Sequence, residues 1–125
     1  MAQIREVLFF KDYFLEFYEE QPIPVQKKID WTIDVVRQFQ MVPEKYLQFM
    51  EGTNGLFEMR SGFGGRIFRV FCCFDEGNLV ILFNGFEKKS QKTPGRELKR
   101  AIRIHKEYLN EKQKGKIADF LRRAP

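Results

Sequence analysis

The sequence contains few of the residues that metal centres and disulfide frameworks require. It has one histidine, His105, and two cysteines, Cys72 and Cys73, which are adjacent. On a strand the two cysteines would point to opposite faces and could not bridge each other, so we interpret them as small buried hydrophobic residues. His105 lies far from both and lacks metal-ligand spacing, and its place on an apolar helical stripe favours a packed histidine. The sequence therefore predicts no metal site.

Long hydrophobic runs are also missing. No apolar stretch approaches the roughly 18 residues of a membrane-spanning helix, and the Met1 end lacks a charged and then apolar leader. The chain has neither an internal repeat nor a low-complexity tract, whereas 43% hydrophobic residues and fourteen Phe favour a packed core. We expect a cytoplasmic protein without a membrane partner. A single domain should span residues 1–125, with 111–125 forming a last turn or a frayed tail.

Negative charge is scarce in the last third of the chain. Residues 1–85 carry nine Lys and Arg against twelve Asp and Glu, whereas 86–125 carry thirteen against five. The formal charge of +5 is thus the sum of −3 and +8. Such an asymmetry indicates a polyanionic partner for the C-terminal part.

The order of predicted elements indicates an α+β fold, with an N-terminal strand and two helices packed on a mainly antiparallel meander sheet, followed by a C-terminal helix. Tyr46–Met50 is predicted to be a turn or short helix. Thr93 and Pro94 are typical of a helix start. The other predicted elements are the strand Gln3–Phe10, the helices Tyr13–Glu20 and Val25–Gln40, and the meander strands Leu56–Arg60, Ile67–Phe74 and Leu79–Phe86.

The strand register is predicted from where apolar side chains must go. Pairing Ser61 with Arg66 makes one face wholly apolar and sets Glu58 opposite Arg69. The alternative, Arg60 opposite Arg66, would bring Arg69 into the core, where an unpaired charge is costly. Closing the second hairpin then sets Arg69 opposite Asn84. With helices on the apolar face, we expect the polar face to be free.

Arginines on that face, next to lysines at its exit, predict a phosphate-binding site. Arg60 and Arg69 suit bidentate contacts and the charge that develops on phosphorus during RNA cleavage. Crowding should lower the pKa of Lys88, Lys89 or Lys92 enough for proton transfer, and Glu58 should orient the arginines. An ion-pair network on a solvated face and a solvated lysine loop are the alternatives that these residues leave open.

Three runs resemble the HigB-like branch of the RelE/ParE superfamily of type II toxin–antitoxin toxins. They are Gly55–Arg60, Arg66–Phe71 and Gly77–Pro94, with Glu97 and Ala101 following. The most specific part is Gly85-Phe86-Glu87-Lys88-Lys89-Ser90-Gln91-Lys92-Thr93-Pro94. The resemblance covers about residues 3–110 and implies a small RelE-like fold.

The resemblance also implies an mRNA endonuclease that works in the ribosomal A site without metal or other cofactor. The 2′-hydroxyl would attack, leaving a cyclic phosphate. A helix-turn-helix antitoxin would neutralise the toxin, and operator DNA would be contacted only through their complex. Carried over by position, the catalytic residues are Arg60, Arg69, Lys88, Lys89 and Lys92. For RNA binding we expect Asn84 and Thr93, also carried over by position, and the basic residues Arg66, Arg96, Lys99 and Arg100.

One departure concerns Asn84, because relatives commonly have histidine at this position. Asparagine does not shuttle protons near neutral pH, so proton transfer would fall to lysine or to ribosomal RNA. Two other functions stay open: a non-enzymatic gyrase inhibitor resembling the ParE branch, and a basic module that only binds RNA or an acidic protein.

Overall fold

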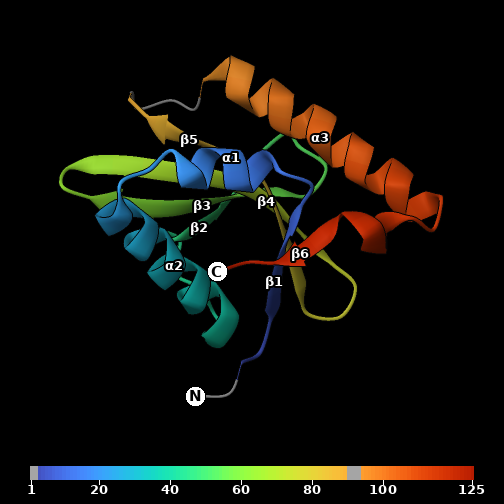
Figure 1. The fold of residues 1–125 in the computed structure, drawn as a ribbon, viewed down its shortest axis with the longest axis horizontal. Helices are drawn as coiled ribbons and strands as arrows, with labels where there is room; N and C mark the ends of the chain where they lie inside the picture. Colours follow the sequence, from blue (N-terminus) through green and yellow to red (C-terminus); the bar gives the residue numbers. More distant parts are fainter. Residues whose placement is uncertain (1–2, 90–93) are drawn as a thin grey trace.

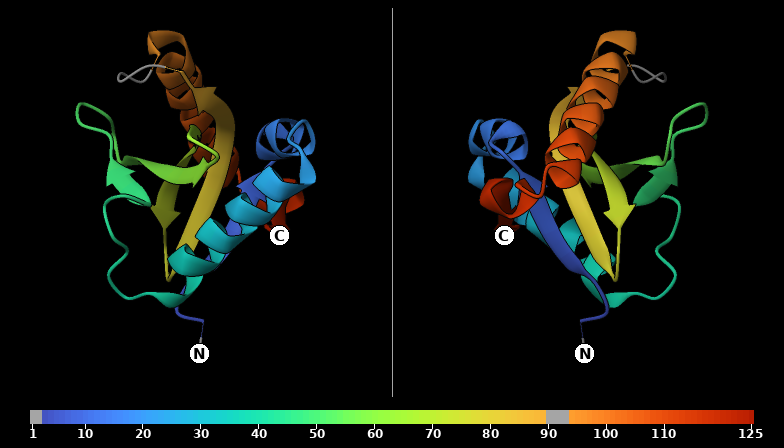
Figure 2. Two further views of the ribbon diagram at one scale, coloured as in Figure 1. Left: turned by 90° about the vertical axis from the view of Figure 1, so that its left-hand side faces the viewer. Right: turned by 90° about the vertical axis from the view of Figure 1, so that its right-hand side faces the viewer.

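The computed structural model describes residues 3–89 and 94–125, which form a six-stranded sheet with helices on both faces (Figures 1 and 2). The predicted α+β architecture is confirmed, including the N-terminal strand, the two helices after it and the C-terminal helix. The strands are β1 (Glu6–Phe10), β2 (Leu47–Phe49), β3 (Leu56–Phe63), β4 (Arg66–Asp75), β5 (Leu79–Lys88) and β6 (Leu121–Arg123). The helices are α1 (Tyr13–Glu19), α2 (Ile23–Gln38), α3 (Gly95–Gln113) and the short 3-10 helix η1 (Ile117–Phe120).

The sheet order is β2-β3-β4-β5-β1-β6, so the meander β3-β4-β5 lies in the middle. The N-terminal strand β1 is parallel to β5, and all other pairs are antiparallel. Beyond Leu82 the strand β5 continues past the end of its pairing with β1. The second half of β5 still pairs with β4, but its other edge borders helices α1 and α3 (Figure 1).

Two short edge strands differ from the predictions. The segment predicted as a turn or short helix contains β2, which pairs with β3 from Leu47 opposite Met59 to Phe49 opposite Phe57. The segment predicted as a last turn or frayed tail forms η1 and then β6, which pairs with β1. Arg37 of α2 donates hydrogen bonds to the carbonyls of Ala124 (2.7 Å) and Pro125 (2.9 Å), which hold the chain after β6.

The predicted register of the first hairpin is wrong by two residues. Phe63 pairs with Arg66, so the turn consists of Gly64 and Gly65 alone, both with positive φ (59° and 78°). Two such residues form the tight turn whose twist matches the flanking strands. Because the shift is an even number of residues, every side chain keeps its predicted face. Arg60 is now directly opposite Arg69.

The register of the second hairpin is wrong by two residues, one at the turn, where Asp75 pairs with Leu79, and one at a bulge in β5. At the bulge the register shifts between Val70 and Cys72, and the two differences together pair Arg69 with Phe86 and not with Asn84. A bulge places one extra residue against its partner strand and changes the direction of nearby side chains. Phe83 and Asn84 are the two residues that lie between the regular pairs on either side.

Each face of the sheet has its own hydrophobic core. Helices α1 and α2 cover one face, where Phe14, Ile29 and Ile33 pack on strand residues such as Val70 and Leu82. Helix α3 covers part of the other face through Ala101, Ile104 and Tyr108 (Figure 2). The expectation that the second face is free is therefore wrong, because α3 has an apolar stripe of its own to bury.

Close contact between α1 and the sheet depends on Gly85 of β5. A β-carbon at this position would lie 2.4 Å from the Phe17 ring. Only glycine leaves room for that ring, which is itself buried. Gly85 thus sets the distance between α1 and β5. None of the helices in the described ranges has the length and hydrophobicity needed to span a membrane.

Candidate functional site

Arg60, Arg69 and Lys88 come together on the face of the sheet that α3 partly covers, and we call them the basic cluster. Arg60 of β3 is paired with Arg69 of β4. Lys88 of β5 pairs with Ile67, two residues from Arg69 and on the same face. Burial has the largest effect on Lys88 and lowers its pKa, and the positive charges of Arg69 and Arg60 lower it further. The negative charge of Glu58 acts in the opposite direction. Both arginines are therefore close enough to Lys88 to lower its pKa.

Arg69 lies at the buried end of this cluster. Its guanidinium donates a hydrogen bond to the Glu58 carboxylate, and only 4% of Arg69 and 1% of Glu58 is exposed. The expectation that this face is free is wrong for both residues, because both side chains are buried. A buried charge needs a partner, and Glu58 supplies one that holds Arg69 in a defined orientation.

Arg60 lies at the accessible end. It is half-buried, and its Nη1 donates to Gln48 Oε1 of β2 at 3.3 Å. Its Nε has no hydrogen-bond partner within residues 3–89 and 94–125. The side chain lines a pocket of about 300 Å³ together with Lys28, Lys45, Tyr46, Gly62 and Ile67. Arg60 can therefore reach a ligand from the edge of the sheet near β2.

Asn84 is fully buried at the bulge and connects β5 to α3. Its Nδ2 donates to the main-chain carbonyl of Glu97 at 3.4 Å, in the first turn of the helix. Its Oδ1 has no partner among the described residues, and neither has the buried Oε1 of Glu97. The amide thus lies beneath α3 and not on an RNA-accessible surface.

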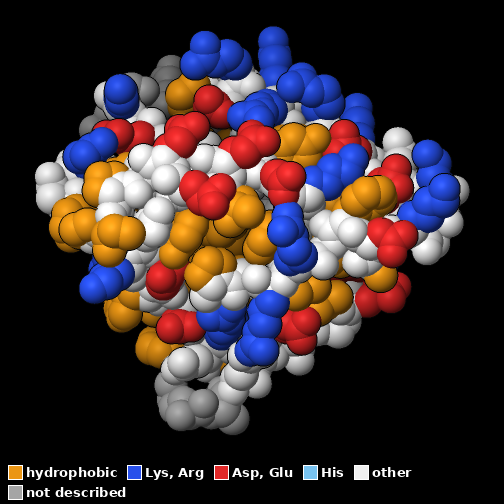
Figure 3. Space-filling model, viewed as in Figure 1, with side chains coloured by type: hydrophobic (Ala, Val, Ile, Leu, Met, Phe, Trp, Pro, Cys, Tyr) orange, Lys and Arg blue, Asp and Glu red, His pale blue; other side chains and the backbone are white. Residues whose placement is uncertain are grey.

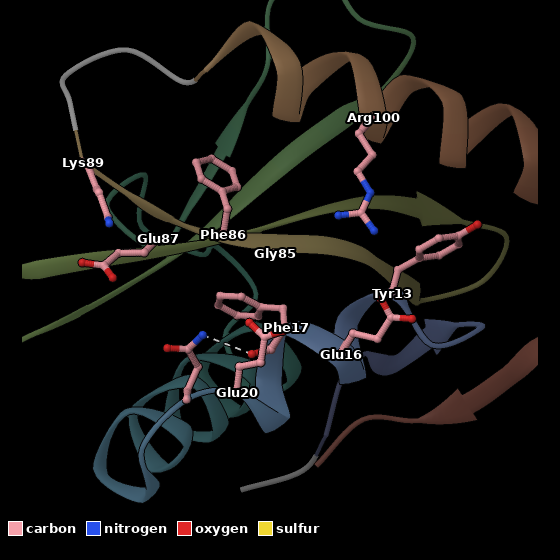
Figure 4. Close-up of a pocket in the computed structure, with 10 residues that line it drawn as sticks. Tyr13, Glu16, Phe17, Glu20, Gly85, Phe86, Glu87, Lys89 and Arg100 are labelled. Carbon is pink, nitrogen blue, oxygen red and sulfur yellow. Dashed lines mark hydrogen bonds between the residues drawn. The ribbon is translucent and has the colours of Figure 1, made fainter.

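Lys89 lies just after the end of β5 and apart from the basic cluster. It lines a pocket of about 390 Å³ at the free part of β5, between α1 and α3 (Figure 4). Figure 4 shows Lys89 beside Glu87 at one end and Arg100 of α3 at the other. The Arg100 guanidinium lies 5.8 Å from the centre of the Tyr13 ring. Glu16 of α1 and Glu20 at its C-cap line the opposite wall.

The remaining predicted residues are scattered. Arg66 forms a two-point ion pair with Glu87, at 2.9 Å and 2.7 Å, on the exposed end of the hairpin. Arg96 and Lys99 are exposed on α3. Lys92 and Thr93 lie outside the described residues, and α3 begins at Gly95 with Pro94 at its N-cap.

Sequence reasoning missed the residues that surround Arg60. Tyr46 and Gln48 come from the segment that was predicted as a turn or short helix, and Lys28 and Lys45 were not among the predicted site residues. No local pattern marks them, because they reach Arg60 through the pairing of β2 with β3. A three-residue strand is too short to show alternation.

The cysteines and the histidine are packed as predicted. Cys72 and Cys73 are free, buried and belong to opposite cores. Burial raises the pKa of both thiols, that of Cys73 to about 12. His105 is 8% exposed against the Phe83 ring, and burial lowers its pKa. In the part of the chain that the structure describes, no three His, Cys, Asp or Glu side chains are grouped to hold a metal ion.

Comparison with known proteins places this arrangement in a family. A family model described as phage derived protein Gp49-like (DUF891) matches residues 16–106. This segment runs from α1 into α3 and contains the whole basic cluster. No curated protein matches the chain. The match covers well over half of the 125 residues. The chain therefore belongs to the Gp49-like family of phage-derived proteins, a family of type II toxins of the RelE/HigB-like kind.

Proposed function

We propose that this protein is the toxin of a type II toxin–antitoxin module and that it cleaves mRNA on the ribosome. The family supports the coarser part, a toxin with an antitoxin partner. The observation that carries the finer part is the basic cluster, in which Arg60, Arg69 and a half-buried lysine of lowered pKa share one face. Perturbed lysines beside arginines suit phosphodiester chemistry.

Lys88 is our candidate general base. A lowered pKa increases the fraction of neutral amine near pH 7, and the neutral amine can take the proton of a ribose 2′-hydroxyl. The 2′-oxygen then attacks the adjacent phosphorus and the 5′-oxygen leaves, which produces a cyclic phosphate without a metal. Lys89 points into a different pocket, so we assign it to RNA binding instead.

Arg60 is our candidate for stabilising the charge that develops on phosphorus. Its side chain is half-buried and borders an open pocket, so its guanidinium can turn toward a phosphate. Arg69 is held by its ion pair with Glu58 and does not contact the phosphate in this scheme. It is a positioning residue, whose charge contributes to the lowered pKa of Lys88.

Asn84 is not a proton donor in this scheme. Its amide binds the backbone of α3 and has no titratable proton near neutral pH. Protonation of the leaving 5′-oxygen then falls to the ammonium form of Lys88, after it has accepted the 2′-proton, or to ribosomal RNA. A helix-turn-helix antitoxin, cytoplasmic action and operator binding through the complex complete the proposal.

The test is cleavage of mRNA on programmed ribosomes, measured by primer extension. Lys88→Met should abolish cleavage, and Lys88→Arg should do so too because arginine cannot release its proton. The logarithm of the single-turnover rate should rise with pH up to the pKa of Lys88 and then level off. Lys106→Met, an exposed α3 lysine outside the site, is the matched control. Full activity of Lys88→Met would contradict the proposal.

A non-enzymatic toxin is the second candidate, and specific contacts favour it. Arg69 and Arg66 are both already engaged by carboxylates, which leaves fewer guanidinium groups for phosphate. Growth arrest with intact transcripts and an induced DNA-damage response would indicate gyrase inhibition. RNA binding that weakens steeply with salt, without toxicity, would indicate a simple binding module.

A further inference from the structure

Helix α2 carries an exposed stripe that neither its own core nor the basic cluster uses. Pro24, Lys27, Lys28 and Trp31 recur at spacings of three and four, which places them on one side of the helix. Trp31 is 45% exposed, and Phe63 at the nearby hairpin is 44% exposed. An exposed tryptophan next to an exposed phenylalanine indicates a surface that binds something.

This stripe is continuous with the accessible end of the basic cluster. A pocket of about 430 Å³ is lined by Pro24, Lys27, Lys28, Trp31 and Phe63. The pocket next to it also includes Lys28 and extends to Lys45, Tyr46 and Arg60. We call Lys27, Lys28, Trp31, Lys45, Tyr46 and Phe63 the aromatic–lysine surface. Figure 3 shows hydrophobic and basic side chains side by side along this edge of the molecule, near the β3–β4 hairpin and α2.

The rings and the lysines are interleaved. Lys28 Nζ lies 3.9 Å from the centre of the Trp31 ring, and Lys45 Nζ lies 4.9 Å from that of Tyr46. The two rings meet edge to face at 5.3 Å. Exposed rings with ammonium groups around them can stack on bases while the lysines neutralise the phosphates.

The charge of this surface favours a polyanion over a protein. Within residues 3–89 and 94–125, no carboxylate lies within ion-pair distance of Lys27, Lys28 or Lys45. Lysine is depleted in protein–protein interfaces, whereas uncompensated lysines beside aromatic rings are typical of surfaces that bind single-stranded nucleic acid.

We propose that the aromatic–lysine surface binds single-stranded RNA beside the scissile nucleotide, with unpaired bases stacked on Trp31 and Phe63. The inference deepens the proposed function, since it rests on RNA entering at Arg60 and names the path that the strand follows away from it. The phosphates of that strand contact Lys27, Lys28 and Lys45.

Trp31 is the only tryptophan in the chain, so its fluorescence reports on this surface alone. The probe is a 2′-O-methyl oligouridine, which lacks the attacking hydroxyl and cannot be cleaved. Binding should quench the fluorescence, and an abasic chain of equal length should bind through its phosphates without quenching. In an anisotropy assay, Trp31→Ala should reduce the affinity of the protein for the oligouridine by about tenfold. The logarithm of the association constant should fall linearly with the logarithm of the salt concentration. Replacing the three lysines by alanine should make this slope less steep by about 2.

Two matched controls lie outside the surface. Phe39→Ala removes an aromatic side chain of similar exposure, 44%, at the other end of α2. Lys116→Ala removes an exposed lysine in the loop after α3. Neither should change the affinity for oligouridine.

An absence of quenching, or equal affinity of the wild type and Trp31→Ala, would overturn the inference. Self-association that depends on Trp31, without oligonucleotide binding, would assign the surface to a second copy and overturn it too. Because the probe cannot be cleaved, these outcomes are independent of catalysis. Quenching in a protein that cuts no mRNA would refute only the proposed function. Cleavage that Lys88→Met abolishes and Trp31→Ala leaves unchanged would refute only the inference.

Discussion

The two faces of the sheet differ in what they bury. The face under α1 and α2 is mostly apolar, and its buried side-chain hydrogen bonds include Ser61 with Thr32 at 2.8 Å and Arg37 with the carbonyl of Ala124 at 2.7 Å. The face under α3 buries an ion pair, Glu58 with Arg69, and the amide of Asn84 beside its hydrophobic cluster.

This difference indicates a division of tasks within a small domain. Apolar burial contributes stability roughly in proportion to area, so the first face can hold the fold together mainly through its hydrophobic core. A buried ion pair is weak evidence for stability, because desolvation offsets much of the attraction. The second face therefore retains its charges at little benefit to folding, which fits a role in binding or catalysis.

The largest effect is expected from breaking the ion pair. Arg69→Ala removes the guanidinium that the Glu58 carboxylate faces in a site from which water is excluded. Removing one member of such a pair typically costs about 3–5 kcal/mol. We expect a loss of this order in the free energy of unfolding, measured by urea denaturation, together with loss of toxicity.

A double variant separates the structural effect from the functional one. Glu58→Gln with Arg69→Met replaces both charges by neutral side chains of similar size, and it should recover much of the lost stability. It should stay non-toxic, because the field around Lys88 has changed. Toxicity restored along with stability would show that the second face serves folding alone.

The assignment of residues to faces could be predicted from the sequence, but the register and the burial could not. The period-two pattern of β3 and β4 suffices to place Arg60 and Arg69 on one side. The length of the turn is ambiguous, because Phe63 resembles a loop residue although Gly64-Gly65 is a typical two-residue turn. The burial of Arg69 depends on tertiary packing, which the alternating pattern of one strand does not encode.

Lys88 and Lys89 illustrate the same limit. As part of a loop they would form one basic group, whereas β5 extends through Lys88 and separates the two side chains. The bulge at Asn84 has no signature in the sequence, and β6 requires a partner, β1, at the other end of the chain. Non-local pairing decided each of these features.

The next effect tests packing on the apolar face. Gly85→Ala introduces a β-carbon 2.4 Å from the ring of Phe17, so α1 or the ring must move. Overpacking of this kind costs about 1–3 kcal/mol, and we expect that loss in thermal unfolding. Phe17→Leu in the same chain should relieve part of it. A Gly85→Ala variant as stable as the wild type would show that α1 is not held at this distance.

A smaller effect is expected where α3 is fastened to the sheet. Asp75, at the end of β4, accepts hydrogen bonds from Tyr108 and Lys112. Burial alone would raise the pKa of Asp75, but the bonds from Lys112 and Tyr108 outweigh it and lower the pKa below its usual value. A lowered carboxyl pKa stabilises the fold at neutral pH, and this stability is lost as the pH falls through the folded-state pKa.

Asp75→Asn should therefore cost about 1 kcal/mol at pH 7, where the wild-type carboxylate is charged. The difference between the two proteins should shrink as the pH is lowered past the pKa of Asp75. Urea midpoints measured from pH 7 to pH 2 provide the test. A difference that is constant over this range would mean that shape, and not charge, fastens α3.

The smallest effect is expected at the exposed ion pair between Arg66 and Glu87, which resembles the buried pair in chemistry and differs from it in solvent. Its hydrogen bonds raise the pKa of Arg66 and lower that of Glu87, yet water and salt screen exposed charges. Arg66→Ala should leave the urea midpoint unchanged within error.

If Arg66 also binds RNA, the same variant should weaken oligonucleotide binding at low salt and Glu87→Ala should strengthen it, because Glu87 competes with phosphate for the guanidinium. Opposite signs in binding with no change in stability would separate this pair from Glu58 and Arg69, whereas a large loss of stability in Arg66→Ala would remove the distinction between exposed and buried pairs.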